Sequence, residues 1–401
     1  MKRFLLILFF IAAIFCDKKT FAQIDSTPIL KSYQVGIFAP LYLDSLFSTS
    51  GNFRYKQGIP KFVMPGVDFV QGAQIAFDSM HVWNADIHAY VYDSKSYKTP
   101  ITTLIANRSL DNLDLIIGSV KDNDYKQLAD FAGKKNIPFI SATYPNDGGV
   151  TANPFVMIAN STLKAHCEAI FSYALQNHGT DKILLCRQSG TQEDKVSAYF
   201  KTFNEQDGKK LLNIEILNFD SSISASFLRS RLDSNKQSII IGGSLDEDFA
   251  SNLATACYNI DKEFPITYPI TLIGMPNWDG FKSFTTKDAY ENFPIYFTTP
   301  YFNNKWDSHS KMIAAVYNKK YKGSPSDMTF KGFESVWLFT KLLAKYPNDF
   351  MSHINDKTFK VFTEYNFHPV KLKKENAIPD YFENKHLYFV KILNGTLSKA
   401  W

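Results

Sequence analysis

Residues at the spacings that catalysis or metal binding requires are scarce in this sequence. The motifs G-x-x-x-x-G-K-[ST], G-x-G-x-x-G, H-E-x-x-H, C-x-x-C and G-x-S-x-G do not occur, which argues against nucleotide, zinc and serine-hydrolase sites. Eight histidines are scattered along the chain, and no two are separated by three or four residues: His81, His88, His166, His178, His309, His353, His368 and His386. We interpret each as a surface or core residue and expect no metal site.

Neighbouring acids are the remaining candidates for catalysis. Glycoside hydrolysis needs only two carboxyl groups at a set separation in space. Asp111 with Asp114, and the run Asp246, Glu247 and Asp248, could in principle supply them. Solvated acids at helix starts are the simpler interpretation. We therefore expect a protein that is not an enzyme and that uses no cofactor.

Composition is typical of a globular protein with two domains of ordinary size. The chain has 401 residues, of which 45% are apolar and 21% charged. Its formal net charge is +5. Four bases and one acid fall within residues 1–22, so the rest of the chain is close to neutral. Nucleic acid is therefore not an expected partner, because phosphate binding needs a strongly basic surface.

The first 22 residues have the pattern of a signal peptide. Lys2 and Arg3 precede an apolar run over 4–15, and Ala22 is an acceptable residue before a cleavage site. Lipidation of Cys16 is the less favoured alternative, because the bulky Phe15 precedes it. Since no other stretch is long and apolar enough to span a membrane, we expect a periplasmic protein that does not cross it.

Three cysteines follow the leader: Cys167, Cys186 and Cys257. An odd number allows at most one disulfide within one chain, and Cys167 with Cys186 is the pair nearest in sequence. Export would permit this bond. Three thiols buried as small apolar side chains are the alternative, and the sequence leaves the choice open.

Short β-rich runs alternate with helix-period runs, as in βαβ units with a parallel sheet. The first series of predicted strands covers 33–38, 87–92, 113–117 and 138–141. A second series covers 183–186, 214–217, 239–241, 270–273 and 295–298, and a helix is expected near 308–321. Asn394-Gly395 between two extended runs predicts a hairpin at the C-terminal end. Two lobes of similar α/β construction are therefore expected.

Six segments follow one another over nearly the whole mature chain: VGIFAPL (35–41), GAQIAFD (72–78), IIGSV (116–120), IPFISAT (137–143), ITLIG (270–274) and GFESVWL (332–338). Together, and in this order, they resemble the branched-chain amino-acid binding proteins of the type I periplasmic solute-binding family. The resemblance implies a periplasmic-binding fold of type I, with two doubly wound parallel-sheet lobes joined by a three-strand hinge. Lobe 1 would comprise 33–158 plus 298–362, and lobe 2 would comprise 159–297 plus 363–401.

In this family the ligand lies between the lobes at the carboxyl ends of the strands. The crossings between lobes would fall near 159–161, 297–300 and 363–369. The resemblance implies ligand contacts from lobe 1 at Ser119, Ala142, Thr143 and Tyr144, and from lobe 2 at Gln188, Ser189, Ser244, Asn277, Trp278 and Asp279. Ser119 and Thr143 could instead simply cap the helices that follow them.

Two departures from the family pattern bear on the ligand. The acid that would pair with a ligand ammonium is present only with an offset, at Asp279. The loop over 42–64 is longer than usual and carries Tyr42, Phe53, Arg54 and Tyr55. It is either a surface lid without ligand contact or an aromatic cover over the cleft that includes Tyr42.

The resemblance implies a solute-binding receptor that captures an amino acid, a short peptide or a similar small polar molecule for an ABC-type permease or a sensor. The alternative is a protein-interaction module of the same fold that regulates cell-wall synthesis. Such a module would keep its cleft shut or empty and would expose an apolar patch.

Overall fold

A computed structural model describes residues 31–80, 85–220, 222–286 and 289–401. The predicted signal peptide and Cys16 lie outside the described residues. Among the described helices, none combines the length and the apolar character that crossing a membrane requires.

The first lobe is built on a seven-stranded sheet with the order β13-β14-β5-β4-β3-β1-β2. All neighbouring strands are parallel except β13 and β14. The strands are β1 (Lys31–Ala39), β2 (Ala85–Asp93), β3 (Leu115–Gly118), β4 (Phe139–Ser141), β5 (Val156–Ile158), β13 (Phe367–Val370) and β14 (Tyr381–Asn384).

Helices cover both faces of this sheet, because successive side chains of a buried strand point to opposite faces. Leu115 and Ile117 of β3 pack with one set of helices and Ile116 packs with the other. The first set is α3 (Met64–Ser79), α11 (Ser308–Tyr321) and α12 (Asp327–Lys345), and the second is α4 (Ile101–Ala106) and α5 (Asp122–Lys135). The lobe is therefore doubly wound, as predicted.

The second lobe repeats this construction on a sheet with the order β16-β15-β12-β11-β10-β6-β9. Its strands are β6 (Lys182–Arg187), β9 (Ile214–Asn218), β10 (Ser238–Gly242), β11 (Ile270–Ile273), β12 (Ile295–Thr299), β15 (Tyr388–Leu393) and β16 (Thr396–Lys399). The central pairs are parallel, and β15 pairs antiparallel with β12 and β16.

The remaining elements of this lobe are five helices, one 3-10 helix and a small hairpin among the described residues. They are α6 (Leu163–Asn177), α7 (Thr191–Asn204), β7 (Glu205–Gln206), β8 (Lys209–Lys210), α8 (Ala225–Arg229), α9 (Glu247–Glu263), η1 (Pro276–Gly280) and α10 (Lys282–Thr285). The predicted C-terminal hairpin is confirmed. Asn394 and Gly395 both have positive φ, 49° and 71°, as a two-residue turn of the primed type requires.

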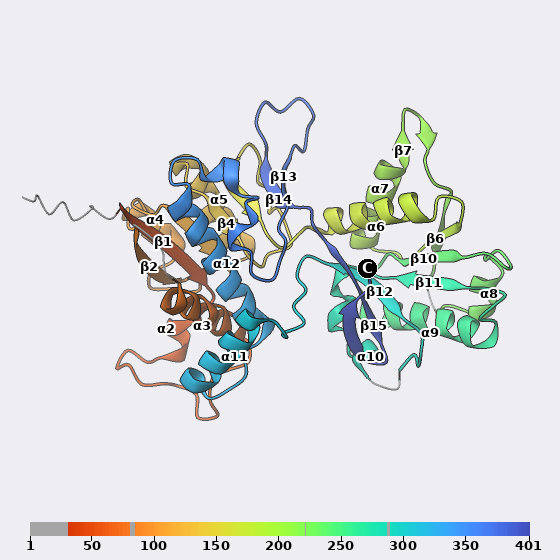
Figure 1. Ribbon diagram of the computed structural model, residues 1–401, viewed down its shortest axis with the longest axis horizontal. Helices are drawn as coiled ribbons and strands as arrows, with labels where there is room; N and C mark the ends of the chain where they lie inside the picture. Colours follow the sequence, from red (N-terminus) through yellow and green to blue (C-terminus); the bar gives the residue numbers. More distant parts are fainter. Residues whose placement is uncertain (1–30, 81–84, 221, 287–288) are drawn as a thin grey trace, which may run out of the picture.

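The two lobes lie side by side along the longest axis of the molecule (Figure 1). The chain passes between the sheets three times, at 159–162 after β5, at 300–307 after β12 and at 385–387 between β14 and β15. The predicted architecture of two doubly wound α/β lobes is confirmed, and the three segments that join the lobes are irregular chain rather than strands.

The prediction for the third crossing needs correction. We expected it near 363–369, with 363–401 in lobe 2, but β14 pairs with β5, so 367–384 belongs to the first sheet. Pro369 lies in β13 at the edge of that sheet, where a missing N–H is tolerated. We propose lobe boundaries that place 307–384 in lobe 1 and 388–401 in lobe 2.

Cys167, Cys186 and Cys257 are free and buried, so Cys167 and Cys186 do not form a disulfide. Burial in apolar surroundings raises the pKa of each thiol well above its usual range. These groups therefore act as small core side chains.

Two glycines allow α3 and α12 to pack directly backbone against backbone. A Cβ atom at Gly72 would lie 1.9 Å from the Thr329 carbonyl oxygen, and one at Gly332 would lie 2.0 Å from the Phe69 carbonyl oxygen. No side chain fits at either position without a shift of a helix backbone. This contact fixes the position of α12, whose first turns lead toward the second lobe.

We predict that Gly332→Ala destabilises the protein by about 1–3 kcal/mol. Alanine gains up to about 1 kcal/mol in helix propensity, but the clash with a backbone carbonyl outweighs this gain. Urea unfolding followed by circular dichroism measures the change. Gly280→Ala is the control, because a Cβ atom there meets nothing within 4 Å, and it should change stability by less than about 0.5 kcal/mol. Equal stability of the two variants would contradict the prediction.

Candidate functional site

Four of the predicted ligand residues meet in a cavity of about 310 Å³ in lobe 1, at the carboxyl ends of β1, β3 and β4. They are Tyr42, Ser119, Thr143 and Tyr144. The Ser119 and Thr143 hydroxyls lie 3.1 Å apart and share a hydrogen bond. Neither side chain caps a helix, since α5 begins after Lys121 without a side-chain cap. Both hydroxyls are therefore available to a ligand.

Ser94 adds a polar group to this cavity that sequence reasoning did not identify. Its side chain is buried, lines the cavity, and its Oγ has no hydrogen-bond partner among the described residues. A buried hydroxyl without a partner costs free energy. A ligand hydrogen bond would recover that cost.

Tyr42 is held at the rim of the cavity in a left-handed backbone conformation, with φ of 54°. Such a conformation is uncommon for residues other than glycine and needs support from its surroundings. Asp93 supplies it: its carboxylate accepts hydrogen bonds from the amides of Leu41, Tyr42 and Leu43, at 2.9, 3.0 and 2.7 Å. Phe62 packs edge-on against Tyr42, with ring centroids 5.1 Å apart.

The second cavity, of about 380 Å³, lies between the two lobes. Loops after β4, β5, β10, β11 and β12 line it together with residues of α6, α7 and α12: Pro145, Asn146, Asn160, Ser161, Leu163, His166, Gln192, Leu245, Pro276, Asn277, Asp279, Thr299, Pro300 and Lys331. Pro145 also lines the lobe 1 cavity, so the two cavities adjoin. Of the predicted residues, Asn277 and Asp279 lie here.

Charge in the interlobe cavity comes from Asp279 and Lys331. Burial raises the pKa of the Asp279 carboxyl, and Lys331 opposes that rise. Burial lowers the pKa of the Lys331 ammonium, while Asp327, Asp279 and Glu334 oppose that fall. His166 is neutral at pH 7, because burial lowers its pKa to about 3.

Four predicted residues have other partners. The Ala142 amide donates to the Gly118 carbonyl at 2.9 Å, so its backbone N–H is part of the sheet. Ser189 donates to Asp220, and Ser244 donates to Glu193 at 2.6 Å and accepts from Gln188. Ala142, Gln188, Ser189 and Ser244 line neither cavity.

The prediction of a ligand contact for Trp278 is corrected. Its side chain has no exposed surface, and its indole N–H donates to the Ser244 carbonyl at 2.9 Å. The ring fills the space beside Gly242 and Gly274, where a Cβ atom would lie within 2.4 Å of it. Trp278 therefore stabilises the core of lobe 2 and positions the loop that carries Asn277 and Asp279.

Sequence reasoning missed several residues of the interlobe cavity, above all Asn160, His166, Gln192 and Lys331. Asn160 lies in the predicted first crossing between the lobes, and this position in the sequence could have identified it as a candidate. His166 contacts the first crossing and the strand before the second: its backbone N–H donates to the Thr162 carbonyl at 3.2 Å, and its Nδ1 lies 2.7 Å from Thr298 Oγ1. Lys331 immediately precedes the GFESVWL segment, but the direction in which its side chain points depends on how α12 packs.

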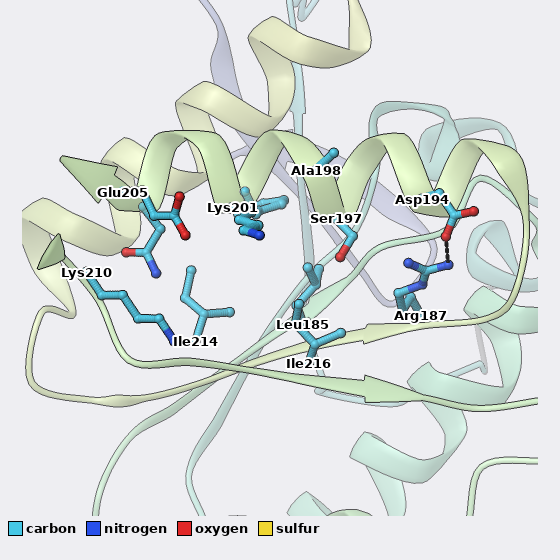
Figure 2. A pocket seen from close by; sticks show the side chains of 12 residues that line it. Leu185, Arg187, Asp194, Ser197, Ala198, Lys201, Glu205, Lys210, Ile214 and Ile216 are labelled. Atoms are coloured by element: carbon cyan, nitrogen blue, oxygen red, sulfur yellow. Dashed lines mark hydrogen bonds and ion pairs between the residues drawn. The ribbon is translucent and has the colours of Figure 1, made fainter. Parts of the chain in front are cut away.

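A third cavity, of about 480 Å³, lies within lobe 2 between α7 and the edge strand β9. Figure 2 shows aliphatic side chains such as Ile214 and Ile216 below the helix, and an ion pair between Arg187 and Asp194 at one end. No predicted ligand residue lines it. We therefore place the candidate site at the lobe 1 and interlobe cavities. Over the described residues, no group of three or more His, Cys, Asp or Glu side chains is arranged to hold a metal ion.

The family model described as periplasmic binding protein matches residues 61–360. The chain therefore belongs to the periplasmic binding protein family, and its fold is the type I fold of that family. No curated protein matches the sequence.

Solved structures show the same fold. A branched-chain amino acid ABC transporter periplasmic ligand-binding protein from Burkholderia xenovorans is 13% identical, with a TM-score of 0.55 over 92% of this chain and 94% of that chain. An ABC transporter substrate-binding protein from Desulfitobacterium hafniense in complex with Leu is 12% identical, with a TM-score of 0.51 over 92% and 100%. A branched-chain amino acid transporter substrate-binding protein from Streptococcus pneumoniae in complex with isoleucine is 16% identical, with a TM-score of 0.50 over 92% and 98%.

The buried neutral His166 predicts acid sensitivity. Its pKa is about 3 in the folded protein against 6.5 for the free side chain, so the unfolded chain binds more protons between these values. Its contribution to stability is complete above pH 6.5 and is lost as the pH falls toward 3, with a slope of at most about 1.4 kcal/mol per pH unit.

Urea unfolding at a series of pH values from 7 to 4 measures this effect. His166→Gln should show a shallower fall in stability than the unsubstituted protein. His368→Gln, at an exposed position, should keep the full slope. A parallel fall in all three proteins would show that His166 does not contribute.

Proposed function

We propose that this protein is an extracytoplasmic solute-binding receptor that captures a small polar ligand in the space between its lobes. The observation that carries the proposal is the interlobe cavity, which loops at the carboxyl ends of strands from both sheets line together. This is the place where open α/β sheets bind ligands. An amino acid or a short peptide is the ligand class that the resemblance to the branched-chain amino-acid binding proteins suggests.

Within this proposal, Ser119 and Thr143 are the anchors of lobe 1. Their paired hydroxyls lie at the ends of β3 and β4, where they can donate to an anionic group such as a ligand carboxylate. Tyr42 and Tyr144 supply apolar contact area beside them. Asn277 and Asp279 approach from lobe 2. The ligand would therefore contact both lobes and stabilise their mutual closure.

The hinge supports the same proposal. Three short crossings connect the lobes, and the chain can bend there without disturbing either sheet. Ligand contacts from both sides would then favour the closed arrangement of the lobes. The Ser119 and Thr143 hydroxyls would move toward the loop that carries Asn277.

We further propose that the protein is exported and that its partner is an ABC-type permease or a sensor. Support comes from the family and from structures of similar fold that are, by name, an ABC transporter substrate-binding protein and an ABC transporter periplasmic ligand-binding protein. The alternative, a module that regulates cell-wall synthesis, has no support in these comparisons. The proposal assigns no catalytic step to the protein.

We predict that at least one compound from a panel of amino acids, short peptides and nucleosides raises the melting temperature by several degrees. A ligand at about 100 times its Kd adds about 2.7 kcal/mol to the free energy of unfolding. Ser119→Ala with Thr143→Ala should raise the Kd at least about tenfold, because charge-assisted hydrogen bonds are lost.

Differential scanning fluorimetry and isothermal titration calorimetry measure these effects. The control variant is Ser352→Ala with Thr202→Ala, two exposed positions that line neither cavity, and it should bind like the unsubstituted protein. Equal stabilisation of all three proteins by the ligand would show that Ser119 and Thr143 do not bind it. No shift with any compound, in protein shown to be folded, would contradict the receptor proposal.

A further inference from the structure

Lys331 places an ammonium group in the interlobe cavity without a protein partner. It lies in the second turn of α12, in lobe 1, and lines the cavity together with Asn277 and Asp279 of lobe 2. Among the described residues, its Nζ makes no hydrogen bond and no ion pair within 4 Å. The contact recorded for it is the ring of Tyr301, whose centroid is 5.3 Å away.

Two of the acids nearest to Lys331 are already engaged elsewhere. The Glu334 carboxylate accepts hydrogen bonds from the Phe362 amide and the Thr363 hydroxyl, both at 2.8 Å, and from the Thr363 amide. Asp327 pairs with Lys305 at 3.0 Å. Asp279 remains, on the other side of the cavity, and does not reach ion-pair distance of Lys331 in this conformation.

The free-energy cost of an unpaired ammonium at Lys331 indicates that an anionic partner is missing. Half-burial removes water from the Lys331 ammonium and lowers its pKa, and a cation without a partner in such a place is unfavourable. An anion within hydrogen-bond distance would offset the lost hydration. The cavity has room for one, at about 380 Å³.

The other polar groups that line the cavity are suited to hold such an anion without competing for Lys331. They are neutral donors and acceptors: Asn146, Asn160, Ser161, Gln192, Asn277 and Thr299. His166 is neutral at pH 7. The Asp279 carboxylate also lines the cavity, but it forms no ion pair with Lys331 among the described residues, so it leaves the ammonium free to bind an anion.

We propose that Lys331 is the anion-binding group of the interlobe cavity, and that the ligand carries a carboxylate or a similar anionic group that its ammonium binds. The inference rests on the proposed receptor function and narrows its ligand class. For a ligand whose first carboxylate is held by Ser119 and Thr143, Lys331 would take a second acidic group. Acidic ligands are then preferred over their neutral amides.

Paired probes that differ in one group test the proposal: glutamate and glutamine, aspartate and asparagine, and glutarate and its monoamide glutaramate. Melting temperatures and Kd values are measured for the unsubstituted protein, Lys331→Met and Lys341→Met. Lys341 is the matched control, because it lies on the same helix, is half-buried and lines neither cavity. Methionine keeps most of the length of the side chain and removes the charge.

At least one acidic probe should stabilise the unsubstituted protein and Lys341→Met, and its amide should not. Lys331→Met should weaken the binding of the acidic probe at least about 30-fold, with little effect on the melting temperature without ligand. Equal binding of acid and amide, or unchanged binding in Lys331→Met, would overturn the proposal for Lys331. If the compounds that bind carry no second acidic group and bind Lys331→Met unchanged, the receptor function stands and this inference fails; if nothing binds, both fail.

Discussion

Parallel pairing at the centre of each sheet is the constraint on which the rest of the structure depends. Parallel strands need a crossover connection, usually a helix, so helices cover both faces and the carboxyl ends of successive strands meet at one edge. Loops after β4 and β5 in one sheet and after β10, β11 and β12 in the other line the same cavity. Side chains far apart in the sequence are therefore gathered between the lobes.

The three crossings hold these two edges together. Ser161 in the first crossing donates to the Asn384 carbonyl at 2.6 Å, and the Thr162 amide donates to Glu383 at 2.8 Å. His166 connects the first crossing with Thr298, which lies just before the second. These bonds join segments more than 100 residues apart in sequence, and each is buried. They give the connection between the lobes a defined geometry.

The sequence predicted most of the fold because buried parallel strands are short apolar runs between turn residues. β5 was not predicted, and β13 was missed because a proline such as Pro369 is rare inside a strand. The candidate ligand residues of lobe 1 could be predicted from the sequence, since Ser119 and Thr143 directly follow strands. Trp278 was misjudged because its burial depends on the empty space at Gly242 and Gly274. The sequence could not predict that Lys331 lines the cavity, because the direction of its side chain follows from the packing of α12 on α3.

The proposed receptor function requires the lobes to close around a ligand, and a distance measurement across the space between them tests this closure. Spin labels on Asn123→Cys, after β3, and Thr191→Cys, after β6, report on the two edges. Both positions are exposed, whereas the three native thiols of the described chain are buried and will not compete. With a compound that raises the melting temperature, the distance between the labels should shorten by several ångströms and its distribution should narrow. An unchanged distance in the saturated protein would contradict the account.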